Sequence, residues 1–277
     1  MFQKITLNLK KELRKNKLGI VAIIIILILV LASLLAFLAP HNPNKINIAQ
    51  RMEGPSLQHF FGTDDLGRDY FARSLYGGRV SLSVGFFSMI ISVLLGTVIG
   101  TISGFVGGKT DSLIMRGIDM LMSIPSFFII LIVNAYFQSS IRNIILIIGL
   151  LSWMRVARLV RAETLSIKER DFVLYAKVTG EKKFKIIIKH IIPNIISTII
   201  VTSSINIATA ILMESSLSFL GLGVQPPDAS WGSMLKSAQG YLGEAPYLAL
   251  FPGLLILLTV LSFNILGDIF RSAFEEN

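Results

Sequence analysis

The sequence predicts an all-α integral membrane protein that crosses a bilayer about six times. Of its 277 residues, 53% are hydrophobic and only 16% are charged, whereas soluble domains carry about 25% charged residues. The charges are clustered, which leaves apolar stretches near the ~20 residues that a helix needs to cross ~30 Å of hydrocarbon. We therefore expect no separate soluble domain. The chain has no cysteine, which excludes disulfides, thiolate chemistry and zinc–cysteine sites.

The chain begins with a basic tail, residues 1–17, followed by an apolar run over residues 18–40. A secretory signal peptide is the alternative to a spanning helix here. Signal peptides have an apolar core of about 7–15 residues and a small-x-small cleavage site. This run is longer, and its end, Ala36-Phe37-Leu38-Ala39, lacks that spacing. We expect a retained first transmembrane helix.

Five further apolar segments predict the remaining spans, at residues 81–101, 113–137, 144–160, 194–222 and 248–267. Pro125 is expected to kink the third span. Residues 41–80 form a loop with an amphipathic helix from Arg68, and residues 81–277 form the transmembrane core. Within that core, the loop 161–192 is long, basic and amphipathic.

The basic residues are distributed unequally between the two sides of the membrane. Six spans place both termini on one side, and 19 of the 26 Lys and Arg residues then lie on that side. Cytoplasmic segments of membrane proteins carry such an excess, so we predict that both termini and the loop 161–192 are cytoplasmic. The net charge of +9 therefore suits membrane lipid, and no nucleic acid partner is expected.

The loop 161–192 predicts a short helix, a glycine break, a second amphipathic helix and a proline that opens the next span. Phe172, Tyr175, Ala176 and Thr179 recur at helical spacing and form one face. An exposed face of this kind fits a groove on a partner protein. Alternatively, the segment is an interfacial helix on anionic lipid, and spacing alone leaves both open.

The same loop resembles the cytoplasmic loop of membrane subunits of binding-protein-dependent ABC importers. Their motif is E-A-A-x-x-x-G, nine residues, then I-x-L-P, and Ala176, Gly180, Ile192 and Pro193 match at this spacing. Leu174 and Tyr175 replace the family's Glu and first Ala, and His190 stands at its Ile. The resemblance implies an ATPase-docking coupling loop made by Phe172, Leu174, Tyr175, Ala176, Thr179, Gly180 and Pro193.

Two other stretches resemble the second (C-type) permease of oligopeptide, dipeptide and nickel importers. They are residues 61–85, which begin Phe61-Gly62-Thr63-Asp64-Asp65-Leu66-Gly67-Arg68-Asp69, and residues 214–232, which begin Glu214-Ser215-Ser216-Leu217. The resemblance implies the ABC importer permease fold in a bacterial cell membrane. It also implies a second homologous permease, two ATP-binding subunits that carry ATP and Mg, and an extracellular substrate-binding protein. Peptides are the favoured substrate, with nickel, metal chelates and glutathione-like molecules open.

Two sets of residues inside the spans have candidate roles. Glu214 lies within the fifth span, where a charged group must face the bundle interior or a cavity. Together with Ser215 and Ser218 it is a candidate for the translocation path or for a subunit interface. Small residues on one helix face allow close helix approach, and the four-residue spacing of Gly96, Gly100 and Gly104 predicts helix packing.

A stretch from Ser103 to Thr110 resembles a P-loop, G-x-x-x-x-G-K-[ST], with Ser103 at the first glycine. A P-loop needs a strand before it and a soluble helix after it, whereas spanning helices are expected on both sides here. We therefore expect no nucleotide site, no cofactor and no catalytic site on this chain. His41, His59 and His190 are scattered, so no metal site is expected either. Asp119 and Arg116 lie at i,i+3, within reach of an ion pair, which would be ordinary interfacial packing.

The main rival from another class is an ion-coupled secondary transporter, which usually needs intramembrane charges and an internal repeat. Glu214 is the one clear deep charge in the sequence, and no repeat is evident. A channel or an assembly scaffold is a third interpretation.

Overall fold

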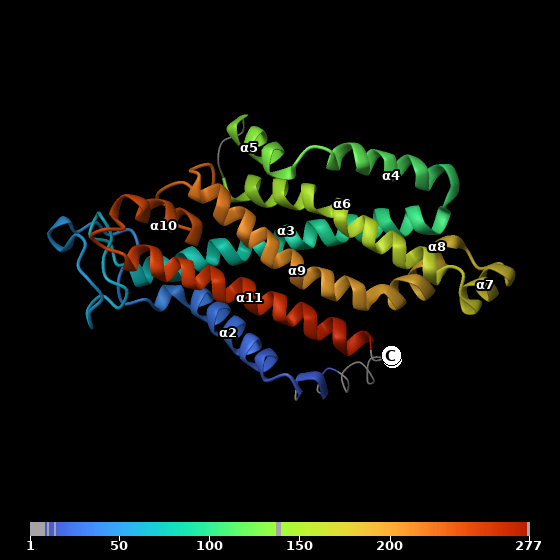
Figure 1. The fold of residues 1–277 in the computed structure, drawn as a ribbon, viewed down its shortest axis with the longest axis horizontal. Helices are drawn as coiled ribbons and strands as arrows, with labels where there is room; N and C mark the ends of the chain where they lie inside the picture. The colour runs from blue at the N-terminus through green and yellow to red at the C-terminus, as the bar shows by residue number, and fades with distance from the viewer. Residues whose placement is uncertain (1–8, 10, 14, 137–139, 276–277) are drawn as a thin grey trace.

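The computed structural model describes residues 9, 11–13, 15–136 and 140–275, which form a helical bundle without a named strand (Figure 1). Most of the expected tail 1–17, and Phe137 at the expected end of the third span, lie outside the described residues. The long helices are α2 (Lys17–Leu34), α3 (Tyr70–Val106), α4 (Gly108–Met122), α5 (Ser126–Tyr136), α6 (Ile141–Ile167), α9 (Ile192–Phe219) and α11 (Tyr247–Glu275). Shorter helices are α7 (Asp171–Val178), α8 (Lys183–Ile186) and α10 (Trp231–Ala238).

Five of the described helices are long and apolar enough to cross a membrane, and α4 with α5 makes a sixth crossing if that pair is one span. The expected all-α fold with about six spans is therefore confirmed. The pair is bent by 71°, and the break falls at Ser123-Ile124-Pro125. The expected kink at Pro125 is confirmed as a break, because proline removes a backbone donor and clashes with the preceding turn.

The second span is longer than expected. The amphipathic stretch from Arg68 supplies the first turns of α3, which begins at Tyr70 and continues to Val106 without a proline. Asp69 caps this helix, since its side chain accepts a hydrogen bond of 2.7 Å from the backbone N–H of Ala72. The residues from Tyr70 to Val80, which precede the expected second span, are therefore part of the same helix.

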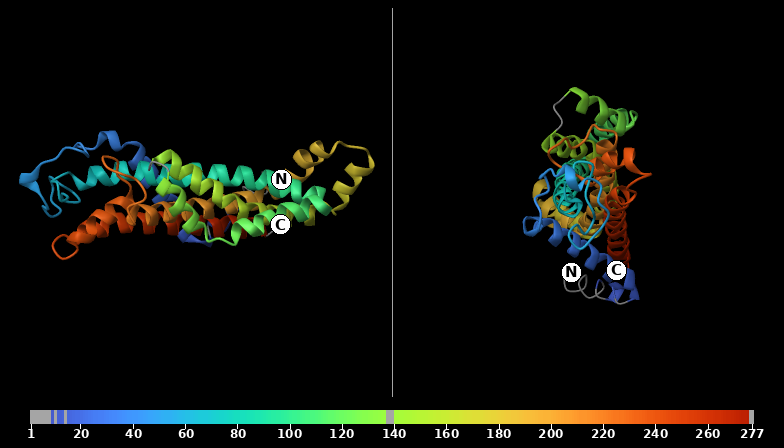
Figure 2. Two further views of the ribbon diagram at one scale, coloured as in Figure 1. Left: turned by 90° about the horizontal axis from the view of Figure 1, so that it is seen from above. Right: turned by 90° about the vertical axis from the view of Figure 1, so that its left-hand side faces the viewer.

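Helix α3 runs through the centre of the bundle, where α6, α9 and α2 pack against it (Figure 1). The first turn of α2 packs against the last turns of α11, where Gly19 meets the side chain of Ile269. The described parts of the two termini thus lie at one end of the bundle. The loop with α7 and α8 protrudes from that same end in Figure 2.

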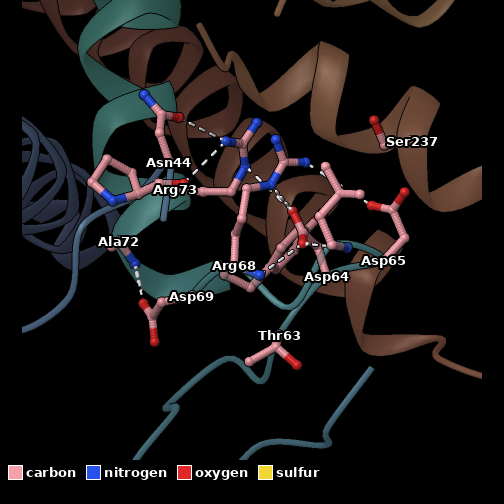
Figure 3. Close-up of polar contacts among 12 residues, drawn as sticks. Asn44, Thr63, Asp64, Asp65, Arg68, Asp69, Ala72, Arg73 and Ser237 are labelled. Atoms are coloured by element: carbon pink, nitrogen blue, oxygen red, sulfur yellow. Dashed lines mark hydrogen bonds and ion pairs between the residues drawn. The ribbon is translucent and has the colours of Figure 1, made fainter. Parts of the chain in front are cut away.

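The opposite end of the bundle is covered by residues 35–69 and 220–246, which we term the cap. In the cap, Asp64 accepts hydrogen bonds from the backbone N–H of Arg68 and from its side chain, at 2.9 and 2.7 Å (Figure 3). Arg73, on the first turns of α3, donates to the backbone carbonyl of Pro43 and to the side chain of Asn44, each at 3.1 Å. These contacts fix the cap to the top of α3.

The loop end of the bundle differs from expectation at Asp119 and agrees with it at the P-loop lookalike. Asp119 pairs with Arg158 on α6 and not with Arg116, because α4 lies beside α6 and offers a tertiary partner. The P-loop lookalike is a turn between two helices, α3 and α4, in which Gly107 and Gly108 have φ of 70° and 57°. No strand precedes it among the described residues, as the sequence context predicts.

Candidate docking loop and polar groove

The segment between α6 and α9 folds on its own small apolar core. Val173 and Ala176 of α7 are buried against residues of α6, α8 and the start of α9. The buried members of this cluster are Val156, Val160, Ile167, Val173, Ala176, Ile186, Ile191 and Ile195. The loop is therefore a packed structural unit joined to both spans.

Gly180 ends α7 in the way that the sequence suggests. Its φ is 77°, a left-handed conformation that glycine adopts without the steric cost of a β-carbon. The N–H of Glu181 donates to the carbonyl of Ala176, and the N–H of Gly180 donates to that of Lys177, both at 3.1 Å. This is the Schellman pattern of a helix end, and it turns the chain back toward α9.

The outer side of α7 differs from the expected face, because it lacks Ala176 and includes Leu174 and Val178. Tyr175 is 72% exposed, Val178 is 87% exposed, and Phe172, Leu174 and Thr179 are also exposed. Ala176 is only 4% exposed, so its expected place on the outer face is wrong. It lies three residues after Val173 on the inner side of the helix, where a methyl group fits against the loop core.

Glu181 joins the two halves of the loop. Its carboxylate accepts from Lys185 at 3.0 Å and is 3.1 Å from His190 Nε2. The Lys185 ammonium, with a smaller contribution from His190, holds the pKa of the Glu181 carboxyl below its usual range. His190, which stands at the family's Ile position, thus connects the start of the fifth span to Glu181 just after α7.

Pro193 lies in the first turn of α9, where its ring removes one backbone donor from the helix. A π-helical turn, Ile187–Ile191, leads into it. The Asn194 side chain donates to the His190 carbonyl at 2.7 Å. Pro193 therefore fixes the junction between the loop and the span, and it lies outside the exposed face.

The three glycines of α3 lie directly on α6. A β-carbon at Gly96, Gly100 or Gly104 would come within 2.4 to 2.8 Å of Val156, the Ala157 carbonyl or Thr164, respectively. Close to the last glycine, Lys168 donates to the Gly104 carbonyl at 3.0 Å. The glycine face therefore lets two spans of this chain approach closely, next to the loop.

A groove of about 540 Å³ opens beside the loop, between α6, α9 and α11. Its α9 side is a polar stripe in which residues recur every three or four positions. The polar and charged lining residues are Arg155, Glu163, Arg170, Asn194, Ser197, Thr198, Thr202, Asn206, Thr209 and Arg271. The Asn206 amide nitrogen is buried and has no hydrogen-bond partner among the described residues. Sequence analysis missed this stripe, although its spacing along the fifth span is visible.

Glu214 does not line this groove. It is fully buried within the chain, where it accepts from Ser218 at 2.6 Å and from Ser81 of α3 at 3.1 Å. Ser215 is also buried, and its backbone packs against Gly232 of α10. The expected role of Glu214, Ser215 and Ser218 in a path or subunit interface therefore has no support in their position. They join α3, α9 and α10 of one chain.

A bundle of apolar spans, a protruding loop between the fourth and fifth of them and a polar groove beside that loop together define a membrane permease. The chain belongs to the family described as the binding-protein-dependent transport system inner membrane component, whose model matches residues 96–276. Residues 10–55 also match the N-terminal transmembrane domain of oligopeptide transport permease C. The chain is thus a multi-pass permease subunit of a bacterial ABC importer.

Several relatives cover nearly the whole chain. It is 41% identical over 266 residues to the dipeptide transport system permease protein DppC of Alkalihalophilus pseudofirmus, covering 96% of this chain and 88% of the relative. It is 42% identical over 255 residues to the glutathione transport system permease protein GsiD of Escherichia coli, covering 92% and 84%. The oligopeptide transport system permease protein OppC of Haemophilus influenzae is 40% identical over 272 residues, covering 96% and 86%.

The fold also matches solved structures of the MetNI methionine ABC transporter in inward-facing conformations. One of them has a TM-score of 0.62 and 16% identity, and the match covers 73% of this chain and 96% of that one. At this identity the likeness shows the fold alone. Because the chain belongs to the ABC importer permease family, the interpretations as a secondary transporter, a channel or a scaffold are set aside.

Proposed function

We propose that this chain pairs with a second homologous permease, with two ATP-binding subunits at the loop end and a substrate-binding protein at the cap. ATP and Mg belong to the ATP-binding subunits, and this chain supplies half of the pathway. The observation that carries the proposal is the exposed apolar side of α7, formed by Tyr175 and Val178, on a loop that is otherwise packed against α6 and α9. Such a rigid element transmits the closure of a docked subunit into the spans.

A packed loop that docks on a moving partner offers a direct route for coupling. Val173 and Ala176 are buried against the ends of α6 and α9, so a displacement of α7 moves both helices. The same two helices form walls of the polar groove. ATP-driven motion at the loop would therefore change access to the groove, which is a shift between two conformations driven by differential contacts.

The proposed substrates are peptides. The relatives are named for dipeptides, oligopeptides and glutathione, and the groove presents amides, hydroxyls and charges of both signs. These groups suit a zwitterionic chain with backbone donors and acceptors. Nickel or a metal chelate is the second candidate, and uptake of labelled dipeptides, glutathione and nickel in cells carrying the whole importer separates the two.

The docking proposal is tested at Val178, because its side chain is 87% exposed and does not belong to the buried core of the loop. Val178→Glu should abolish co-purification of the ATP-binding subunits and uptake, with the permease still in the membrane. Val178→Thr has nearly the same shape without the charge and serves as the matched control. Normal assembly and uptake in Val178→Glu would refute docking through this face.

The proposed orientation places both termini and the loop in the cytoplasm and the cap outside. It rests on the excess of basic residues at the loop end, 19 of 26 in the chain. A reporter fused after Gly180 should be cytoplasmic, and one fused near Gln50 should be external. The opposite labelling would reverse the orientation and move the docking surface to the other side.

A further inference from the structure

The cap brings together three side chains that are far apart in its sequence. His41 follows the first span, His59 lies in the middle of the cap, and Asp69 caps α3. One ring nitrogen from each histidine and one carboxylate oxygen of Asp69 lie within 4.8 Å of one another. The expectation that the histidines are scattered holds for His190 and is wrong for the other two.

The hydrogen bonds in this cluster determine which ring nitrogens are free. His59 Nδ1 lies 2.8 Å from the Asp69 carboxylate, and His41 Nε2 lies 3.0 Å from the backbone carbonyl of Gln58. Carboxylate and carbonyl oxygens are acceptors, so both of these nitrogens carry a proton and donate. In the neutral rings, the lone pairs are therefore on Nε2 of His59 and Nδ1 of His41.

The free nitrogen of His59 is an unusual feature of this cluster. The His59 side chain is about 5% exposed, and its Nε2 atom is buried without a hydrogen-bond partner among the described residues. Buried polar atoms are normally paired. Both histidines line a cavity of about 200 Å³, which Asn42, Asn47 and Gln50 also line. The cluster therefore contains a buried acceptor nitrogen without a partner, on a residue that borders this cavity.

We propose that the cap binds one divalent transition-metal ion through His41 and His59. Imidazole nitrogen is a preferred ligand of Zn²⁺, Ni²⁺ and Cu²⁺, whereas Mg²⁺ and Ca²⁺ prefer oxygen. Metal-binding histidines almost always donate their second ring nitrogen to a carboxylate or a backbone carbonyl, and Asp69 and Gln58 are such acceptors here. Asp69 is thus a positioning residue, because one carboxylate oxygen holds the ring of His59. The other carboxylate oxygen caps the first turn of α3 at Ala72 (Figure 3).

The bound ion would join the segment after the first span to the segment before the second. Lys45 and Asp69 also line the cavity, so its lining carries a charge of each sign. The cavity lies in the cap, whereas the polar groove lies beside the loop. Because the two sites are separate, the ion would stabilise the cap and would not be a transported substrate in the groove.

The test uses the full chain, stripped with a chelator and equilibrated with Ni²⁺ or Zn²⁺ alone. We expect about one ion per wild-type chain, and at least a tenfold loss of affinity in His41→Gln, since even outer partners of a metal site are worth about 10–100-fold. His190→Gln is the matched control, because this histidine lies on the distant loop and should bind as wild type does. The metal should also raise the thermal midpoint of wild type and not of His41→Gln.

His41 is partly exposed, so His41→Gln should fold, and equal midpoints of metal-free wild type and variant would verify this. The assignment is overturned if wild type binds no more Ni²⁺ or Zn²⁺ than the double variant His41→Gln, His59→Gln. It is also overturned if Mg²⁺ displaces these ions at equal concentration, because the ligands would then be oxygens. Nitrogen ligands in the X-ray absorption spectrum of the Ni²⁺ form, lost in His41→Gln, would support it.

Discussion

A β-carbon at Gly100 of α3 would lie 2.4 Å from the carbonyl oxygen of Ala157 on α6. The neighbour is backbone, so it cannot move aside as a flexible side chain can. The contact lies in the middle of the glycine face, between Gly96 and Gly104. It therefore sets how closely the second and fourth spans pack, and thereby where the loop begins.

We predict that Gly100→Leu separates α3 from α6 and lowers stability strongly. Overpacking of a side-chain contact typically costs about 1–3 kcal/mol, and a contact with backbone should reach or exceed the upper value. The thermal midpoint of the purified permease measures the loss. Gly117→Leu on α4 is the control, since nothing lies within 4 Å of a β-carbon there. Equal midpoints for the two variants would contradict the packing role.

The second prediction separates a structural from a transport role for Glu214. Glu214→Leu should destabilise the chain by about 1–3 kcal/mol for each hydroxyl left unpaired, because the buried Ser81 and Ser218 hydroxyls both donate to this carboxyl. Glu214→Gln keeps an acceptor and should lose less. Uptake per folded transporter should remain in Glu214→Gln. Loss of uptake with an unchanged thermal midpoint would instead place Glu214 in the transport mechanism.

The fold could largely be predicted from the sequence, since the lengths of the apolar segments determine how many helices cross the membrane. Pro125 also marked the break in the third span. The inner side of α7 could not be predicted, because helical spacing shows which residues share a face and not which face packs inward. Val173, one position after Phe172, was the missing signal, since it completes an apolar pair with Ala176.

The cap cluster lay beyond sequence reasoning for a different reason. His41, His59 and Asp69 lie on irregular segments, where no period relates sequence distance to position in space. By contrast, the polar stripe of α9 follows a helical period, and Asn194, Thr198, Thr202 and Asn206 could have been found from their four-residue spacing. Glu214 is the one deep charge in the sequence, and the hydroxyls of Ser81 and Ser218 donate hydrogen bonds to it.

The third prediction concerns the end of α7. Gly180 has a φ of 77°, and no atom lies within 4 Å of a β-carbon built on it. A substitution there therefore strains the backbone but causes no steric clash. Gly180→Asn should retain ATPase co-purification and uptake, because Asn tolerates the left-handed region. Gly180→Val should lose both, because a β-branched residue resists it. Equal behaviour of the two variants would show that the turn does not matter.

The fourth prediction concerns Lys109. It lies in the first turn of α4, after a turn between two helices, so there is no strand–loop–helix cradle for phosphate. Lys109→Ala should leave the affinity of the assembled transporter for ATP unchanged, as measured with a fluorescent ATP analogue. The affinity should also equal that of Lys182→Ala, an exposed lysine elsewhere on the loop side. A large loss of affinity in an intact complex with Lys109→Ala alone would refute this.

The last prediction tests whether the groove is part of the pathway. The buried amide nitrogen of Asn206 has no partner among the described residues, so it costs stability in the isolated chain. Replacing an unpaired polar group by an apolar one of similar shape is nearly neutral or stabilising. Asn206→Leu should therefore keep or raise the thermal midpoint of the permease.

Uptake, however, should fall in Asn206→Leu, because the variant replaces a polar side chain of the stripe that lines the groove by an apolar one. Ser216→Leu is the matched control, since Ser216 is an exposed polar residue of the same helix that does not line the groove. We expect uptake at least tenfold lower in Asn206→Leu than in Ser216→Leu at equal membrane levels. Equal uptake would exclude the α9 stripe from the pathway, whereas a drop in midpoint that accompanies the loss would make Asn206 a structural residue.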